Sequence, residues 1–384
     1  MRCEEVRKKL EDYLNGTCTN EEERAIEEHL QTCEECEREM EEHINQKKIS
    51  AKDWNVPELS YIEQRKIVRK AKWKNRLSTA FTVFGLFFII SIGSAIVTGL
   101  YYKNTGLTAN RVIQTAIQMT LPNVYSDGAG TSTNFYFNAD IQGDLQKSVG
   151  SEERYIGKYH GKMILNYLNG ISKEWVDGRY DLSLIFHYPL GFLNGAYEEN
   201  LEVYRLGDET WEALNKLPEG TVSEIAVSLD GVYTFDEVKR LFKDYDIDIV
   251  WYAIDTGTAR DNDTIDVSIG EDLWGIHEYA WYKLLGDDES DKATKEDAFK
   301  KGLAFLAEHA TWAKRVIWDF DQESIKEMLD YVDEHGVKCY GVVLTGPTKE
   351  LAKLADNEHI TYAALGEVDF WNWTGKQTGG ALYN

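Results

Sequence analysis

Four side chains near the N-terminus have the types and the spacing of a metal site. Cys3 is followed after 25 residues by His29, which opens the pattern His-x-x-x-Cys-x-x-Cys and so leads to Cys33 and Cys36. Side chains three or four residues apart share one face of a helix, so these three can converge, and the distant Cys3 can complete a tetrahedron. Imidazole nitrogen and thiolate sulfur are ligands that Zn²⁺ prefers. The sequence therefore predicts one zinc site with these four ligands.

Two further cysteines fall outside this pattern. Cys18 does not fit the four-ligand set and is predicted to be a bystander thiol, while Cys339 lies in a strand-like run and is predicted to be a small buried side chain. Five cysteines in 384 residues cannot form a disulfide scaffold. In a reducing cytoplasm, clustered thiols hold zinc more often than they form disulfides.

Three short helices are expected to position the ligands. The first covers residues 4–14 and ends before Gly16, with its apolar side chains on one stripe: Val6, Leu10 and Leu14. The next two begin at capping boxes, Thr19-x-x-Glu22 and Thr32-x-x-Glu35. The second box places Cys33 and Cys36 on the first turn of its helix. The core of this head (residues 1–50) contains few large apolar side chains, so a bound metal would supply stability that the core lacks.

A fourth helix is expected to begin at Pro57–Glu58 and to run toward the apolar stretch described next. Its apolar side chains exceed what a very small core needs, so they are candidates for packing against a partner protein. They could equally close the core of the head itself, and both roles are compatible. The residues are Leu59, Ile62, Ile67 and Val68.

Residues 77–102 contain no charged side chain and read LSTAFTVFGLFFIISIGSAIVTGLYY. The stretch is 26 residues long, and a helix needs about 20 residues to cross the hydrocarbon core of a membrane. It begins too far from Met1 to be a signal peptide. A buried core helix is the alternative, but core helices rarely run this long without a charge. The stretch is therefore predicted to be a single transmembrane helix.

The flanking charges predict the orientation of this span. Residues 61–76 carry seven basic side chains against one acidic side chain, Glu63, whereas the first basic residues beyond the span are Lys103 and Arg111. Positive charge stays on the cytoplasmic side. The N-terminus is therefore predicted to be cytoplasmic and residues from 103 onward extracytoplasmic, in a single-pass protein of the cell membrane in contact with the lipid bilayer.

The acidic balance of the chain excludes a class of partner. Its 42 Lys and Arg against 66 Asp and Glu give a net charge of −24. Residues 1–60 contribute −8 and residues 103–384 contribute −22. Direct binding to nucleic acid needs a basic surface, so it is not expected. An acidic head suits a partner whose free face is basic.

Residues 103–384 divide by pattern into two predicted outer domains. Residues 103–215 are predicted to be a strand-rich domain, in which residues from about 110 read as short strands and turns, with the runs NFYFNADIQ, ERYIGKYHG, YDLSLIFHY and ENLEVYRL. Residues 216–384 alternate strands and helices in two strand–helix–strand units, which indicates a ferredoxin-like or related α+β sandwich. The predicted strands are 222–229, 248–254, 339–344 and 360–368, and the predicted helices are 234–245, about 294–310, 322–335 and 348–356. The fold class is thus multi-domain: a small all-α zinc-binding head (1–50), a basic juxtamembrane helix or linker (51–76), a transmembrane helix (77–102) and an α+β outer region.

The N-terminal motif resembles that of the zinc-binding anti-sigma domain. The resemblance rests on Cys3…His29-Leu-x-x-Cys33-x-x-Cys36, preceded by Leu14-Asn15-Gly16 and Glu21-Glu22-Glu23-Arg24. It implies a compact helical domain that binds an alternative sigma factor of the extracytoplasmic-function class and blocks its access to RNA polymerase. Many members of that family are tethered by one membrane span and have an outer sensor domain, which implies release of the sigma factor on an outer signal.

Two further segments resemble a Gram-positive sigma-factor regulator family. The stretch Leu217-Pro-Glu-Gly-Thr-Val-Ser-Glu-Ile-Ala-Val-Ser228, with Val250-Trp-Tyr-Ala-Ile-Asp-Thr-Gly257, is similar to its C-terminal domain. The segment from the basic flank to about residue 165 is similar to its N-terminal domain. This resemblance implies the same pathway and no known chemistry, so the protein is not expected to be an enzyme.

Two alternative functions use residues in the same chain. The four zinc ligands could form a thiol redox sensor, because zinc-bound thiolates can be oxidised. Asp255-Thr256-Gly257 follows an apolar strand, as the Asp-Thr-Gly of an aspartyl hydrolase does, but the matching place in the second unit holds Leu344-Thr345-Gly346. Aspartic proteases need two carboxylates that share a proton. The hydrolase is therefore the weaker hypothesis.

Release of the partner could be proteolytic. Residues 103–130 contain Gly106, Pro122, Gly128 and Gly130 in a weakly patterned stretch, which favours cleavage by a site-1 protease. The span contains small residues that ease local unwinding for an intramembrane protease, namely Gly85, Gly93, Ser94 and Gly99. Small residues also serve helix packing, so a dimer face at Ser91, Ala95 and Gly99 is an equal alternative.

Overall fold

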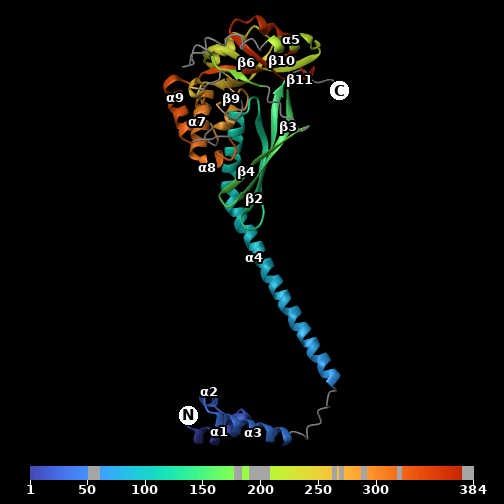
Figure 1. The fold of residues 1–384 in the computed structure, drawn as a ribbon, viewed down its shortest axis with the longest axis vertical. Helices are drawn as coiled ribbons and strands as arrows, with labels where there is room; N and C mark the ends of the chain where they lie inside the picture. The colour runs from blue at the N-terminus through green and yellow to red at the C-terminus, as the bar shows by residue number, and fades with distance from the viewer. Residues whose placement is uncertain are drawn as a thin grey trace. The chain divides into compact units, whose positions relative to one another are not determined.

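The computed structural model describes residues 1–50, 61–176, 184–189, 208–261, 266–267, 272–286, 292–317 and 322–373 (Figure 1). These residues belong to two compact units, Met1–Gly85 and Leu86–Asn384. Three sequence-based predictions fall outside the described residues, namely the strand ENLEVYRL, the start of the fourth helix at Pro57–Glu58 and the position of Leu59. The coarse architecture follows the prediction: a helical N-terminal region, one long apolar helix and a strand-rich C-terminal part with α+β character.

The first unit begins with three short helices, α1 (Cys3–Asn15), α2 (Asn20–Leu30) and α3 (Glu34–Ser50). Gly16 ends α1 with φ of 69°, a left-handed conformation that glycine adopts at little cost. Thr19 and Glu22 form the capping box that begins α2, as predicted. The buried core of this head is small and consists of Val6, Leu10, Ile26 and Cys36. The predicted shortage of apolar core is therefore observed.

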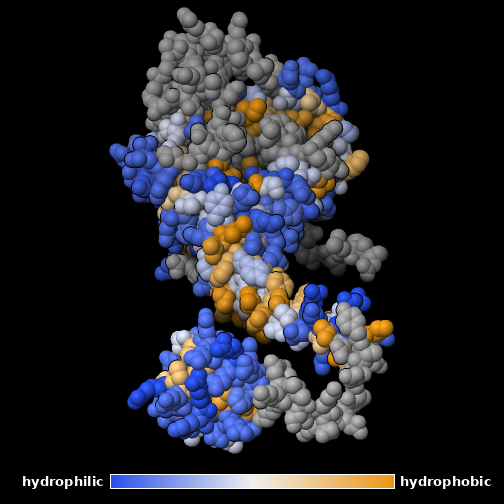
Figure 2. All heavy atoms as spheres, turned by 60° about the horizontal axis from the view of Figure 1, so that its bottom comes forward, coloured by the Kyte–Doolittle hydropathy of each residue, from blue (hydrophilic) through white to orange (hydrophobic). Residues whose placement is uncertain are grey.

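One helix, α4 (Tyr61–Thr120), contains the whole apolar stretch and continues beyond it. At 1.5 Å per residue it is about 90 Å long. Most of its large apolar side chains between Leu77 and Leu100 are exposed, and Figure 2 shows them as a band of hydrophobic atoms (orange), whereas the three-helix head is mostly hydrophilic (blue). The helix is long and apolar enough to cross a membrane.

The C-terminal part of α4 differs from the expectation of strands from about residue 110. Residues 103–120 are helical, and side chains on one face of them are buried in the core of the second unit: Ala109, Val112, Ile113, Ala116 and Ile117. These positions recur every three or four residues, which is the period of a helix with one buried face. The stretch 103–130 is therefore not an accessible loop, because β1 begins at Tyr125.

Four antiparallel strands follow α4 in hairpin order: β1 (Tyr125–Thr133), β2 (Asn138–Val149), β3 (Glu152–Ile164) and β4 (Tyr167–Trp175). Gly106 lets α4 approach β1 closely, since a Cβ atom at this glycine would lie 2.9 Å from Oγ1 of Thr131. Asn110 of α4 donates a hydrogen bond to the same hydroxyl at 2.7 Å. Gly106 thus acts as a packing residue of the helix.

The second sheet has five strands in the order β11-β6-β10-β7-β9, and all neighbouring strands run antiparallel. Their bounds are β6 (Thr221–Tyr233), β7 (Asp248–Ile254), β9 (Gly275–His277), β10 (Cys339–Pro347) and β11 (Ile360–Phe370). A separate two-stranded sheet pairs β5 (Phe186–His187) with β8 (Asp266–Val267). Cys339 is fully buried on β10, as predicted.

Helices connect and cover these strands. They are α5 (Asp208–Lys216), α6 (Phe235–Phe242), α7 (Lys295–Glu308), α8 (Ala310–Ala313), α9 (Gln322–His335) and α10 (Thr348–Ala352), with short 3₁₀ turns at Thr258–Asp261, Trp281–Leu284 and Lys353–Asp356. The strand and helix segments expected in residues 216–384 are each present with shifts of a few residues at their ends. Thr234 caps α6 by accepting the N–H of Glu237.

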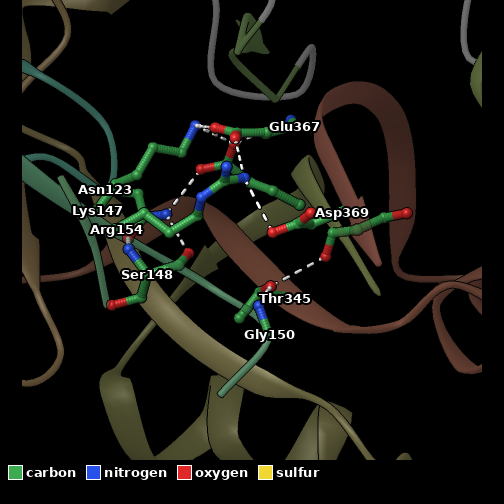
Figure 3. A network of polar contacts seen from close by, with 10 residues as sticks. Asn123, Lys147, Ser148, Gly150, Arg154, Thr345, Glu367 and Asp369 are labelled. Atoms are coloured by element: carbon green, nitrogen blue, oxygen red, sulfur yellow. Dashed lines mark hydrogen bonds and ion pairs between the residues drawn. The ribbon is translucent and has the colours of Figure 1, made fainter. Parts of the chain in front are cut away.

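The two predicted outer domains share one hydrophobic core. It includes residues of α4 and of β2, β3 and β4 together with residues of β6, β7 and β10. A buried polar network also joins the two sheets (Figure 3). Nζ of Lys147 on β2 lies 2.7 Å from Oε2 of Glu224 on β6 and 3.1 Å from Oε2 of Glu367 on β11. The four-stranded sheet is therefore fastened to the five-stranded sheet by packing and by charge.

Candidate metal centre

The structure brings together the four residues that the sequence predicts as ligands. The donor atoms of Cys3, His29, Cys33 and Cys36 all lie within 4.8 Å of one another. Sγ of Cys3 and Sγ of Cys33 are 3.8 Å apart. A disulfide needs about 2.05 Å between its sulfur atoms. A tetrahedral zinc site with Zn–S bonds of about 2.3 Å has sulfur–sulfur edges of about 3.8 Å. The observed separation fits the metal site.

All three helices of the head contribute to this cluster. Cys3 is the first residue of α1, His29 lies in the last turn of α2, Cys33 directly precedes α3, and Cys36 lies in its first turn. The ends of three helices thus meet at one point, although their residues are separated by up to 33 positions in the chain. A metal bound here would tie α1 to the α2–α3 pair.

The predicted capping box at Thr32 is not observed. The Thr32 hydroxyl donates back to the carbonyl oxygen of His29 at 3.1 Å, so it closes α2 and does not begin α3. Cys33 takes the position before the helix, because its carbonyl accepts the N–H of Glu37 at 3.1 Å.

The local environment gives the thiols of Cys33 and Cys36 different acidities. Hydrogen bonding from the backbone of Cys36 lowers the pKa of Cys33, because N–H donors stabilise the thiolate. Burial raises the pKa of Cys36 to about 12. A soft cation in the site would displace the proton of this thiol, since zinc binds the thiolate form.

His29 supplies the test of whether the residues fit a metal. Its Nε2 atom is buried and has no hydrogen-bond partner among the described residues. A buried polar atom without a partner costs about 1–3 kcal/mol, so native proteins rarely leave one unexplained. Coordination to a metal would satisfy this nitrogen. The orphaned imidazole, the sulfur spacing and the donor set therefore all fit a zinc ion held by one nitrogen and three sulfur atoms.

The remaining thiol and histidine of the head lie outside the cluster. Cys18 is half-buried and packs against the core of the head, but it is not in the group of convergent donors. His43 is exposed on α3. The position of Cys18 agrees with the prediction that it is a bystander thiol. The candidate partner residues Ile62, Ile67 and Val68 lie on α4 and are 66%, 54% and 52% exposed.

Asp255 in the second unit has a different environment from a catalytic dyad. Its carboxylate accepts hydrogen bonds from the hydroxyl of Tyr188 at 2.9 Å, from the hydroxyl of Tyr331 at 2.6 Å and from the N–H of Gly257 at 3.1 Å. The side chain is buried after the end of β7. These contacts fasten the turn that follows the strand, which is a structural role.

Three family models match successive parts of the chain. A zinc-finger model matches residues 3–36, which contain all four convergent donors. The sigma factor regulator N-terminal model matches residues 65–154, which cover the apolar helix and the first two strands. The sigma factor regulator C-terminal model matches residues 214–367, which cover most of the five-stranded sheet and its helices.

A curated relative aligns with the chain almost from end to end. It is the probable anti-sigma-M factor YhdL of Bacillus subtilis (strain 168), which is 29% identical over 384 residues, covering 97% of this chain and 100% of the relative. No solved structure matches the chain significantly. The matches to zinc-finger, regulator N-terminal and regulator C-terminal models follow the same order as the observed head, apolar helix and outer body. The chain is therefore similar over almost its whole length to an anti-sigma factor, and its three parts match the zinc-finger and sigma factor regulator families.

Proposed function

We propose that this protein holds an alternative sigma factor of the extracytoplasmic-function class at the inner face of the membrane and releases it on an outer signal. The observation that carries the proposal is the convergence of four metal donors in a three-helix head on the same chain as the apolar helix and the two regulator domains. The head acts by occlusion, because a bound sigma factor cannot engage RNA polymerase. The protein is regulatory and the proposal assigns it no catalytic step.

Zn²⁺ is the proposed metal, held by Cys3, His29, Cys33 and Cys36. When bound, it supplies a structural crosslink between helices whose own core contains four buried side chains. The apolar side chains around the site exclude water from one side of the ligands; they are Val6, Leu10 and Ile26. The helix ends are then fixed in the arrangement that the sigma factor recognises.

The proposed sigma-binding surface combines charge with apolar side chains at the start of α4. Residues 1–60 contribute a net charge of −8, which complements the basic face that a sigma factor uses to contact promoter DNA. Ile62, Ile67 and Val68 are more than half exposed, so they are available for contact. Leu59 is proposed to belong to the same surface.

The proposed topology places residues 1–76 in the cytoplasm, residues 77–102 in the membrane and the second unit's strands outside. The seven basic side chains of residues 61–76 support this orientation. A membrane-impermeant protease added to intact cells should degrade the outer body and leave a protected fragment that an antibody to the head detects. Loss of the head epitope would instead show that the head lies outside the cell, which is the opposite orientation.

Release can follow cleavage or a conformational signal, and the described residues favour the second route. Residues 103–120 are helical and one face of them is buried in the outer core, so a movement of the outer body can be passed along α4 to its cytoplasmic end. Cleavage by site-1 and intramembrane proteases would require local unfolding first. An antibody to the head distinguishes the routes: full-length protein during induction of the sigma regulon supports the conformational signal, and a shortened fragment supports cleavage.

A finer fold assignment belongs with this proposal. The strand order β11-β6-β10-β7, with antiparallel neighbours, is that of a ferredoxin-like sheet in which β6, β7, β10 and β11 are the first to fourth strands. The segment that holds β9, α7, α8 and α9 would then be an insertion between the second and third strands. A solved structure of the outer body would test this assignment.

The decisive experiment identifies what the full-length protein binds. The chain is purified in mild detergent from its native host through a C-terminal tag, and the co-purifying proteins are identified by mass spectrometry. A sigma factor is expected with the wild type and with Cys18→Ser, and not with Cys36→Ser. Recovery of no sigma factor with a zinc-loaded, folded wild type would contradict the proposal.

A redox function of the same four residues can be tested separately from sigma-factor binding. Sγ of Cys3 and Sγ of Cys33 are near neighbours, so oxidation could join them after loss of the metal. Mild oxidant would then release zinc and the partner together. Retention of both under oxidant that modifies free thiols would exclude this alternative.

A further inference from the structure

Two loops of the four-stranded sheet contact α4 inside its uncharged stretch. The β1–β2 loop (residues 134–137) and the β3–β4 turn (residues 164–167), together called the aromatic tip here, lie beside the helix at the same end of the sheet (Figure 1). The hydroxyls of Tyr136 and Ser91 are 2.8 Å apart. The backbone N–H of Tyr136 donates to Oγ of Ser94 at 2.7 Å. These contacts fix the first loop to the helix.

Two more hydrogen-bonding residues of α4 extend this contact. Oγ1 of Thr98 accepts the N–H of Phe137 at 3.0 Å. The hydroxyl of Tyr102 donates to the carbonyls of Phe137 and Leu165, at 2.8 Å and 3.0 Å. The four helix positions are separated by three, four and four residues, so they form one polar stripe on an otherwise apolar helix. The stripe holds the aromatic tip at a fixed height along α4.

The side of the aromatic tip that does not face α4 is exposed and apolar. Five of its side chains are about half exposed, between 48% and 50%: Phe135, Tyr136, Ile164, Leu165 and Tyr167. The surrounding sequence is uncharged over residues 128–139 and 163–172, although residues 103–384 contain 26 basic and 48 acidic residues. Large side chains exposed together in an uncharged patch mark an interaction surface.

The backbone of the aromatic tip is also strained. Tyr136, Phe137 and Leu165 have φ of 57°, 56° and 52°, a left-handed conformation that bulky residues rarely adopt. Each such residue costs on the order of 1 kcal/mol and persists only where the surroundings enforce it. The hydrogen bonds to α4 provide that enforcement. The strain is consistent with a loop shaped to present its side chains in one direction.

The position of the aromatic tip along α4 indicates what surrounds its side chains. About 20 residues counted from Leu77 reach residue 96, so Ser91 and Ser94 lie in the last two turns of the proposed crossing. The helix side chains beside the contact are themselves exposed and apolar, with Ile92 at 55%, Ile96 at 60% and Leu100 at 71%. The aromatic tip is continuous with this apolar surface. The medium that surrounds the helix therefore also contacts the side chains of the tip.

Cationic side chains lie at the base of the aromatic tip. Lys162 precedes the β3–β4 turn by two residues and is exposed, as is Lys103 directly after Tyr102. The guanidinium of Arg315 lies 4.9 Å from the ring centre of Tyr167. Tyrosine and tryptophan gather at membrane interfaces with basic side chains at the height of the phosphates. The order found here is apolar helix, aromatic tip, then cations.

We propose that the aromatic tip inserts into the interface of the outer leaflet and seats the outer body on the membrane. Phe135 and Leu165 would lie among the upper acyl chains, and Lys103, Lys162 and Arg315 would lie at the lipid phosphates. The inference rests on the proposed membrane span of α4. Lipid is the occupant because the same surface continues onto the apolar helix, which lipid must surround.

Photo-crosslinking in vesicles tests this placement. The full-length protein carries p-benzoyl-phenylalanine in place of Phe135 or of Leu165 and is reconstituted into phosphatidylglycerol–phosphatidylethanolamine vesicles. The matched control carries the same residue in place of Tyr155, which is 51% exposed on β3 and about 30 Å along that strand from its tip. Ultraviolet irradiation is followed by mass spectrometry for lipid adducts. Adducts are expected at positions 135 and 165 and not at position 155.

Each other outcome overturns the inference in a recognisable way. Absence of lipid adducts from both tip positions, in protein that floats with the vesicles, shows that the tip lies outside the membrane while the span remains. Adducts between two protein chains in place of lipid adducts show that the tip is a contact between copies. Failure of the protein to float with the vesicles would contradict both the proposed membrane span and this inference.

Discussion

Cys36 and Cys18 form a matched pair of thiols for testing the metal centre at the scale of single residues. Both contribute to the packing of the head, but only Cys36 of the two is among the convergent donors. Cys36→Ser is expected to abolish zinc binding, and Cys18→Ser is expected to leave about one zinc ion per chain. Inductively coupled plasma mass spectrometry of the purified full-length variants measures this. Equal loss of zinc in both variants would mean that the fourth ligand is wrongly assigned.

His277 on β9 predicts how the outer body responds to pH. Burial lowers its pKa to about 4, with the nearby charges of Glu278 and Lys283 acting in opposite directions. An unfolded histidine titrates at about 6.5. The unfolded chain therefore binds the proton first, so stability present above pH 6.5 is lost as the pH falls toward 4, by roughly 3 kcal/mol.

Urea unfolding followed by near-ultraviolet circular dichroism at about pH 7 and pH 5 measures this loss. His277→Gln is the control, because a glutamine oxygen can accept the N–H groups of Tyr279 and Ala280 that Nδ1 of His277 accepts at 3.1 Å and 3.3 Å. The variant should show a smaller change between the two pH values. An unchanged pH dependence would assign the effect to other groups.

At the scale of elements, substitutions of two glycines on α4 distinguish the effect of packing from that of helix propensity. A Cβ atom on Gly106 would lie 2.9 Å from Thr131 of β1, whereas a Cβ atom on Gly99 would meet nothing within 4 Å. Gly106→Val is expected to destabilise the outer body by about 1–3 kcal/mol through overpacking. Gly99→Val should leave its stability nearly unchanged. Thermal unfolding of the two variants in detergent gives the comparison, and equal melting temperatures would contradict the packing role.

The ion pair that joins the two sheets is also expected to contribute to the stability of the outer body. Lys147 and Glu224 are almost fully buried, with side chains 8% and 0% exposed. Lys147→Met leaves the buried carboxylate unpaired, so it is expected to cost about 3–5 kcal/mol. Arg154→Met removes a partly exposed partner of Glu367 and Asp369 and should cost about 1 kcal/mol or less. Denaturant unfolding that ranks the two variants in the opposite order would argue against a buried pair.

For the whole molecule, the central prediction is that the head works without the outer body. Residues 1–76 lie in the first compact unit, which has a core of its own. A zinc-loaded fragment of these residues is expected to inhibit transcription by the cognate sigma factor in a purified system with RNA polymerase. The Cys36→Ser fragment serves as the inactive control. Inhibition by the full-length chain alone would show that the outer body takes part in binding.

Local patterns in the sequence predicted the four convergent donors, the apolar helix and most elements of the second unit. The spacing of His29, Cys33 and Cys36 can be read without a fold, although His29 lies in the last turn of α2 and the two cysteines lie at the start of α3. The segment 248–254 was predicted as a strand and 322–335 as a helix, and both have those bounds in β7 and α9. Such patterns are informative because hydrophobic periodicity and capping act over a few residues.

Only the tertiary structure decided the features that depend on distant contacts. Lys147 and Glu224 are 77 residues apart in the chain, and nothing local marks them as a pair. Ser91, Ser94 and Thr98 read as small residues of a membrane helix until the loop at Tyr136 is seen to contact them. Residues 103–120 look like a weakly patterned linker until the sheets bury one face of them. Packing between remote segments selects these partners, and a single sequence does not contain that information explicitly.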